Sequence, residues 1–167
     1  NLRHVAECLT EFDSARRLAQ QPAAVELAIW FHDAIYDTRA QDNEQKSADW
    51  AVGVIRTVGG SVSQSERVHD LILATRHVAS PSPGDAALMV DIDLGILGAP
   101  VARFEEYEEQ VRREYVWVPE PVFRATRTRI LSEFLARPSI FTTTYFATRY
   151  EAAARQNLSS SLARLTQ

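Results

Sequence analysis

The residues with the clearest chemical potential are His32 and Asp33, which stand side by side in the apolar segment 26–36. Burying an imidazole and a carboxylate among apolar side chains costs free energy unless both are paired. Neighbouring helical residues point about 100° apart, so the two side chains can still converge on an ion beside the helix. A bound cation would offset the burial cost. The structural alternative is a neutral His32 bonded to a nearby carbonyl and Asp33 paired with an arginine of another helix.

Three further segments carry groups that could join such a site. His4 lies near the start of the first helical pattern, on one stripe with Cys8, and can face the interior. Asp91 and Asp93 lie two residues apart in a second apolar segment. Helical geometry turns them about 200° from each other, so at most one can face a common site directly. His77 ends another helical pattern, from which it can be aimed across a pocket.

The order His, His-Asp, His, Asp resembles the HD superfamily of metal-dependent phosphohydrolases, and the resemblance covers nearly the whole chain. It extends beyond the dyad to several spaced strings, which are similar to those of an uncharacterised branch described as predicted HD phosphohydrolases. These strings are ELAIWFHDAIYD, DNEQKSA, LILATRH, DIDLGILG, VRREY and EAAARQNL.

The resemblance implies a ligand set for one divalent ion. His32 and Asp33 would bind it together with an early His and a later Asp. Asp93 matches the later Asp best, because related enzymes with an Asp-x-Asp string use the second carboxylate; Asp91 is the alternative, or a group beside the ligands. His4 is the early His in view. The branch also carries a Tyr-His pair just ahead of the matching string, so we expect the chain to begin within the first helix, and the ligand upstream is an alternative to His4.

Three residues are candidates for catalysis. Glu44 falls where many HD proteins carry an acidic element near the metal, and its alternative role is a first-turn Glu favoured by the helix dipole. His77 falls where they carry a further pocket His, and its alternative role is to interact with the last carbonyls of its helix. Asp37, expected on the same side of its helix as Asp33, either orients a ligand or ends the helix. The mixed nitrogen and oxygen set suits Mn, Fe, Co, Ni, Zn or Mg.

The elements that position these residues are predicted to be helices, because apolar residues recur every three or four positions and alternating runs are scarce. We predict an all-α, HD-like bundle of about eight helices in a single domain spanning residues 1–167. The expected helices cover residues 2–19, 23–36, 43–58, 63 or 65 to 77, 85–97, 101–117, 121–136 and 145–165. Asp42 is expected to cap the third helix, and Gly59-Gly60 to end it.

Composition narrows the classes of partner. The 167 residues are 46% hydrophobic and 24% charged, with a net charge of -4, so no basic face for duplex nucleic acid is expected. No apolar run suggests a membrane span. Cys8 is the only cysteine, which excludes an intrachain disulfide and favours a reducing, cytoplasmic setting. Trp30, Trp50 and Trp117 are expected to be core anchors.

The predicted function is hydrolysis of a small phosphate ester, with nucleotides among the expected substrates, by a water that a metal ion activates. One alternative is an HD-type oxygenase with two irons. Another is a non-catalytic helical sensor that binds a metal or a ligand.

Overall fold

The computed structural model describes residues 2–79 and 81–167. Within these ranges the chain forms eight α-helices and two short 3-10 helices, with no strand. The prediction of an all-α fold with about eight helices is therefore confirmed. The chain divides into two compact units, Asn1–Asp93 and Leu94–Gln167, which are described one at a time. The single HD-like domain remains a prediction.

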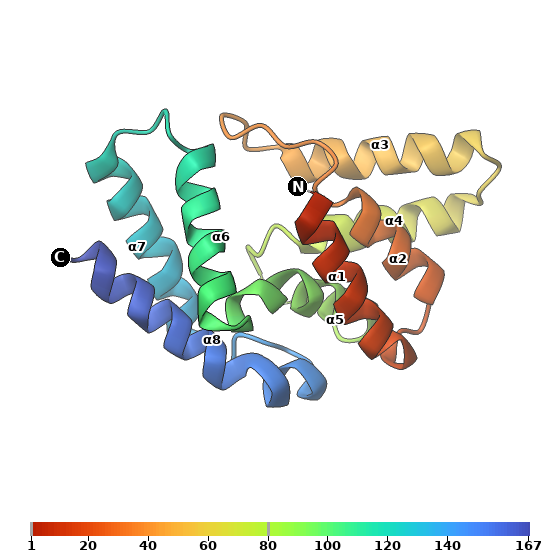
Figure 1. Cartoon of the computed structure of the whole chain (residues 1–167). Helices are drawn as coiled ribbons and strands as arrows, with labels where there is room; N and C mark the ends of the chain where they lie inside the picture. Colours follow the sequence, from red (N-terminus) through yellow and green to blue (C-terminus); the bar gives the residue numbers. More distant parts are fainter. Residues whose placement is uncertain (1, 80) are drawn as a thin grey trace. The chain divides into compact units, whose positions relative to one another are not determined.

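The first unit contains five of the α-helices. Its core is formed where α1, α2 and α5 pack against one another and α4 packs against α2 and α5 (Figure 1). In α1 the buried stripe recurs at helical spacing, as expected for an amphipathic helix; it comprises Val5, Cys8, Phe12 and Ala15. The elements are α1 (Leu2–Ala15), the 3-10 helix η1 (Arg16–Leu18), α2 (Pro22–Phe31), α3 (Asn43–Thr57), α4 (Val62–Ala74) and α5 (Asp85–Asp93).

Local signals mark several helix ends in this unit. Pro22 starts α2, where its missing N–H costs no hydrogen bond. Gly59 has a φ of 86° and ends α3, as predicted. Ser61, rather than Ser63 or Ser65, caps α4 by accepting a hydrogen bond from the backbone N–H of Gln64. Helices α3 and α4 then run antiparallel, side by side (Figure 1).

Asp42 occupies the N-cap position of α3 without capping it through its side chain. Its carboxylate instead lies 2.8 Å from the Lys46 ammonium, one turn along. The expected position was right, but the cap hydrogen bond is replaced by this exposed ion pair.

Helix α2 ends at Phe31 rather than at Tyr36, so the predicted end was wrong. The reason is a contact with α3. The Ser47 hydroxyl lies 3.0 Å from the backbone N of Ile35 and 3.3 Å from its carbonyl oxygen. These tertiary hydrogen bonds replace the bonds that a longer helix would have made.

Four other predicted helices are shorter than expected. Helix α1 ends at Ala15, where η1 follows, and α6 (Val101–Glu114) ends at Glu114 rather than at Trp117. Helix α4 ends at Ala74, and His77 follows in a turn with a φ of 55°. Helix α5 ends at Asp93, where the 3-10 helix η2 (Leu94–Gly98) takes over.

The second unit consists of η2, α6 (Val101–Glu114), α7 (Glu120–Ala136) and α8 (Thr144–Leu165). Helix α8 packs against α7 and η2. The buried Asn157 amide donates hydrogen bonds of 2.9 Å to the carbonyls of Leu97 and Ala99, so it satisfies the end of η2.

The three tryptophans are not core anchors, and this prediction was wrong. Trp30, Trp50 and Trp117 are 52%, 50% and 47% exposed. Within the described ranges, none of the helices has the length and apolar character needed to cross a membrane.

Candidate metal centre

Four side chains of the first unit bring potential metal ligands together. They are His4 and Cys8 on α1, His32 directly after α2, and Asp93 at the end of α5. One ligand atom from each lies within 4.8 Å of the ligand atoms of the other three. Because α1, α2 and α5 pack against one another, residues far apart in the sequence meet at this point.

The shortest distances in the cluster join the two imidazoles and the carboxylate. His4 Nε2 lies 2.9 Å from Asp93 Oδ1 and 3.2 Å from His32 Nε2. His32 Nε2 lies 3.5 Å from Asp93 Oδ1. Two ring nitrogens and a carboxylate oxygen therefore face a common point, which is how the ligands of a single cation are arranged.

The orientation of His32 is held by the helix that precedes it. Its Nδ1 lies 2.8 Å from the carbonyl oxygen of Ile29, to which it can donate a hydrogen bond. This bond places the ring hydrogen on Nδ1 and leaves Nε2 to face the cluster, as in metal-binding histidines whose second nitrogen is anchored. The His32 side chain is only 2% exposed, so the ring has little freedom to turn away.

The charges in the cluster favour a cation. Burial raises the pKa of Asp93, but hydrogen bonds from His32, His4 and His77 outweigh burial and hold that pKa well below its usual value. Burial likewise lowers the pKa of His32, while Asp93 and Asp33 outweigh it and raise the pKa to about 9. The negative field that keeps a proton on His32 would also stabilise a metal ion in its place.

The surroundings of the Cys8 thiol disfavour its charged form. Burial first, and then the charges of Asp93 and Asp33, raise its pKa well above the usual value. A thiol of this kind is a poor nucleophile, because the thiolate is the reactive form. Nucleophilic catalysis by Cys8 is therefore disfavoured, whereas metal ligation would supply the positive charge that a thiolate needs.

Asp33 and Asp91 lie outside this four-residue group. Asp33 Oδ2 is 4.0 Å from His32 Nε2, and the side chain is 32% exposed, so it is accessible at the edge of the cluster. Asp91 is completely buried in α5. Of the two carboxylates left open by the sequence, Asp93 is the one that the structure brings to the cluster.

The three candidate catalytic residues lie in different places. His77 Nε2 is 2.9 Å from Asp93 Oδ2, on the carboxylate oxygen that does not contact His4. Glu44 is half-buried in the first turn of α3. Asp37 is exposed in the turn between α2 and α3, where its carboxylate accepts a hydrogen bond from the backbone N–H of Arg39.

The expected placement of Asp37 on the helix of Asp33 was wrong, because α2 ends at Phe31. The Asn43 side chain holds the Asp37 backbone in the turn through hydrogen bonds of 3.0 and 2.9 Å. The catalytic roles of Asp37, Glu44 and His77 remain predictions.

Sequence reasoning did not identify Cys8 as a ligand. Its sulfur lies 3.6 Å from His4 Nε2 and 3.8 Å from His4 Nδ1. The available signal was the spacing, because residues four apart on a helix lie on the same face. A cysteine one turn after a candidate histidine ligand is thus a candidate ligand itself.

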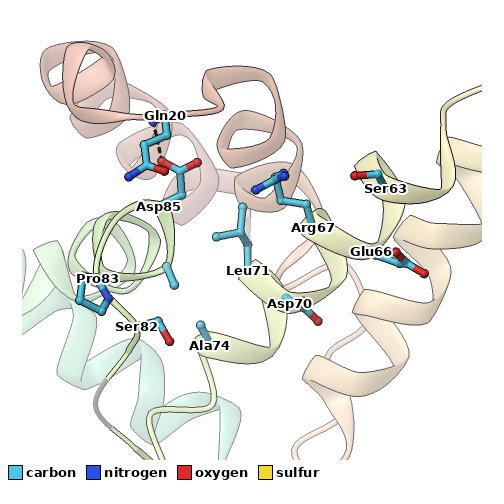
Figure 2. A pocket seen from close by; sticks show the side chains of 11 residues that line it. Gln20, Ser63, Glu66, Arg67, Asp70, Leu71, Ala74, Ser82, Pro83 and Asp85 are labelled. Atoms are coloured by element: carbon cyan, nitrogen blue, oxygen red, sulfur yellow. Dashed lines mark hydrogen bonds between the residues drawn. The ribbon is translucent and has the colours of Figure 1, made fainter.

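A surface pocket of about 650 Å³ lies elsewhere in the first unit (Figure 2). It is lined by residues of α4, the start of α5 and the turn before α2, including Arg67, Asp70 and Asp85. The Asp85 carboxylate accepts hydrogen bonds from the backbone N–H groups of Gln20 and Gln21, which makes it a structural link. None of the four cluster residues lines this pocket. The pocket is large, but potential metal ligands converge only in the cluster of His4, Cys8, His32 and Asp93 among the described residues, so the cluster is the better candidate site.

No protein-family model, curated protein or solved structure matches this chain. The resemblance to the HD superfamily therefore rests on the sequence strings alone.

Proposed function

We propose that this protein is a metal-dependent phosphohydrolase that acts on a small phosphate ester, with nucleotides as one substrate class. The observation that carries the proposal is the convergence of His4 Nε2, His32 Nε2 and Asp93 Oδ1 within 3.5 Å of one another. The resemblance of the sequence to HD phosphohydrolases supports the reaction class.

The donor set fits a divalent ion. Two imidazoles and a carboxylate are ligands for first-row transition metals, and the His32 ring is already oriented by Ile29. Solvent can reach the site, because the His4 and Asp93 side chains are 19% and 15% exposed. A divalent ion held here would polarise a phosphoryl oxygen and lower the pKa of a bound water.

The chain itself would orient the ligands and handle protons. His77 holds the second oxygen of Asp93, which keeps Oδ1 directed at the two imidazoles. The partly exposed carboxylate of Asp33 is an acceptor for a proton from an attacking water. In this proposal Glu44 or His77 assists the water or the leaving group, and the setting is cytoplasmic.

The test begins with the metal content of the purified chain, measured by elemental analysis. We expect about one transition-metal ion per chain, and its loss in His32→Ala and Asp93→Asn. His69→Ala and Asp70→Asn are matched controls, because His69 on α4 contacts Gln45 and the neighbouring Asp70 instead of the cluster. Circular dichroism would establish that each variant remains folded.

A phosphatase and phosphodiesterase screen with added Zn²⁺ or Mn²⁺ forms the second part. Hydrolysis by the wild type that is lost in the folded cluster variants, and kept in both controls, is the expected result. Tight metal binding without turnover on any phosphate ester would replace the hydrolase by a non-catalytic metal-binding module. Failure to bind any ion after reconstitution would overturn the proposed site altogether.

A further inference from the structure

We infer that Cys8 is a fourth ligand of the proposed ion, so that the centre is selective for zinc-like ions over magnesium and manganese. This inference rests on the metal site of the proposed function, but not on the reaction that the site performs. The ligand set would be His4, Cys8, His32 and Asp93, with two nitrogens, one sulfur and one oxygen.

The position of the sulfur follows from the helix that carries it. Cys8 lies four residues after His4 on α1, so both side chains project from the same face. Its side chain is buried, with 2% of the residue exposed. Besides its contacts with His4, the Cys8 sulfur makes one long contact, 3.9 Å to the carbonyl oxygen of Ile92. The residue next to Ile92 is the ligand Asp93, so α1 and α5 bring sulfur and carboxylate together.

Four distances between the ligand atoms lie at or somewhat below those of tetrahedral coordination. An ion with metal–nitrogen bonds of about 2.0–2.1 Å and a metal–sulfur bond of about 2.3 Å separates its ligand atoms by about 3.3–3.6 Å. The two imidazole nitrogens are 3.2 Å apart, and His32 Nε2 is 3.5 Å from Asp93 Oδ1. The sulfur is 3.6 Å from His4 Nε2. The distance of 2.9 Å between His4 Nε2 and Asp93 Oδ1 is the shortest of these four, and it lies below that range, as does the 3.2 Å between the imidazoles.

The sulfur determines which ions the centre prefers. Thiolates are soft ligands that favour zinc and similar transition ions, whereas magnesium and manganese favour oxygen ligands. When the sulfur binds the ion, the S–H bond breaks, the sulfur lone pair forms the metal bond, and the proton leaves to solvent. No oxidant or reductant is required.

The experiment uses Co²⁺ as a spectroscopic substitute for zinc in the full chain. We expect the wild type with one bound Co²⁺ to show a near-ultraviolet sulfur-to-cobalt charge-transfer band. In Cys8→Ser the band should disappear although cobalt remains bound, and zinc affinity should fall by at least about tenfold, since even residues behind the ligands change affinity by 10–100-fold. Affinity for Mn²⁺ should change less.

The outcomes separate this inference from the proposed function. Variants of His32 and Asp93 show whether cobalt binds at the proposed site. If it binds there in the wild type but gives no charge-transfer band, Cys8 is not a ligand, and the metal site itself stands. If the wild type binds no cobalt at all, both proposals fail. The wild-type spectrum decides the question even if Cys8→Ser does not fold, and His69→Ala should leave that spectrum unchanged.

Discussion

Asp93 has different partners on its two carboxylate oxygens. Oδ1 faces His4 and His32, while Oδ2 lies 2.9 Å from His77 Nε2. Hydrogen bonds behind a ligand set its direction and its basicity, and they are worth 10–100-fold in metal affinity in known sites. In the proposed metal site, His77 would therefore position Asp93.

Replacing His77 by Asn tests this role at the level of one residue. Asn tolerates the positive φ that His77 adopts, so the backbone should be preserved. We expect metal affinity to fall by about tenfold because Asp93 loses its second partner. Isothermal titration with Zn²⁺ measures the change, with His69→Asn as control. Unchanged affinity in folded His77→Asn would show that Asp93 needs no support from His77.

At the scale of elements, α8 packs closely against η2 at Gly98. A Cβ added at Gly98 would lie 2.6 Å from the Cβ of Tyr150, which is too close for either helix to keep its place. Gly53, inside α3, has open space around the same position. Replacing each glycine by alanine should therefore change the stability in opposite directions.

We expect Gly98→Ala to lower the free energy of unfolding by about 1–3 kcal/mol, the usual cost of overpacking. Gly53→Ala should raise it by about 0.5–1 kcal/mol, because alanine is the better helix former. Urea denaturation measures both values. Equal effects of the two substitutions would argue against close contact at Gly98.

A second element-level contact joins α8 to the loop after α7. The Glu151 carboxylate accepts hydrogen bonds from the backbone N–H groups of Ile140 and Phe141 and from the Ser139 hydroxyl, and it pairs with Arg155. Burial raises the pKa of Glu151, but these hydrogen bonds outweigh it and lower the pKa below 4.5. A charged Glu151 thus holds the loop on α8.

The lowered pKa predicts a pH dependence of stability. Because the folded state binds the Glu151 proton more weakly than the unfolded state, this contribution is present above pH 4.5 and is lost as the pH falls through the folded pKa. Glu151→Gln should cost about 1–2 kcal/mol at pH 7, and the difference from wild type should shrink below pH 4.5. Thermal unfolding across pH measures it. Glu133→Gln, whose exposed side chain pairs with Arg129, should have little effect at any pH.

At the scale of the whole molecule, all four proposed ligands belong to the unit Asn1–Asp93. They come from α1, from the end of α2 and from the end of α5. A bound ion would connect three helices that are separate in the sequence, and binding to the folded state alone stabilises it by about 2.7 kcal/mol at 100 times the dissociation constant.

Hydrogen exchange measured by mass spectrometry, with and without Zn²⁺, tests which helices the ion stabilises. Zinc should slow backbone exchange in α1, α2 and α5 more than in α6, α7 and α8. His32→Ala should remove the difference. Protection confined to the unit Leu94–Gln167 would place the ion elsewhere in the chain.

Short-range features of the sequence determined the fold class, several helix ends and one part of the candidate site. Apolar residues at helical spacing predict the all-α class, Pro22 and Gly59 mark helix ends, and the His32-Asp33 pair in an apolar segment indicates a polar site. These features act within one or two turns of a helix, so a single sequence is enough to recognise them.

Tertiary structure alone decided the remaining points. Helix α2 stops at Phe31, and Ser47 of α3 binds the backbone N–H and carbonyl of Ile35 beyond that end. Asp93 rather than Asp91 reaches the cluster, and Cys8 joins it, because α1 packs against α5. Each result depends on a contact between segments far apart in the sequence, and helical periodicity gives a side chain's face but not the element that will cover it.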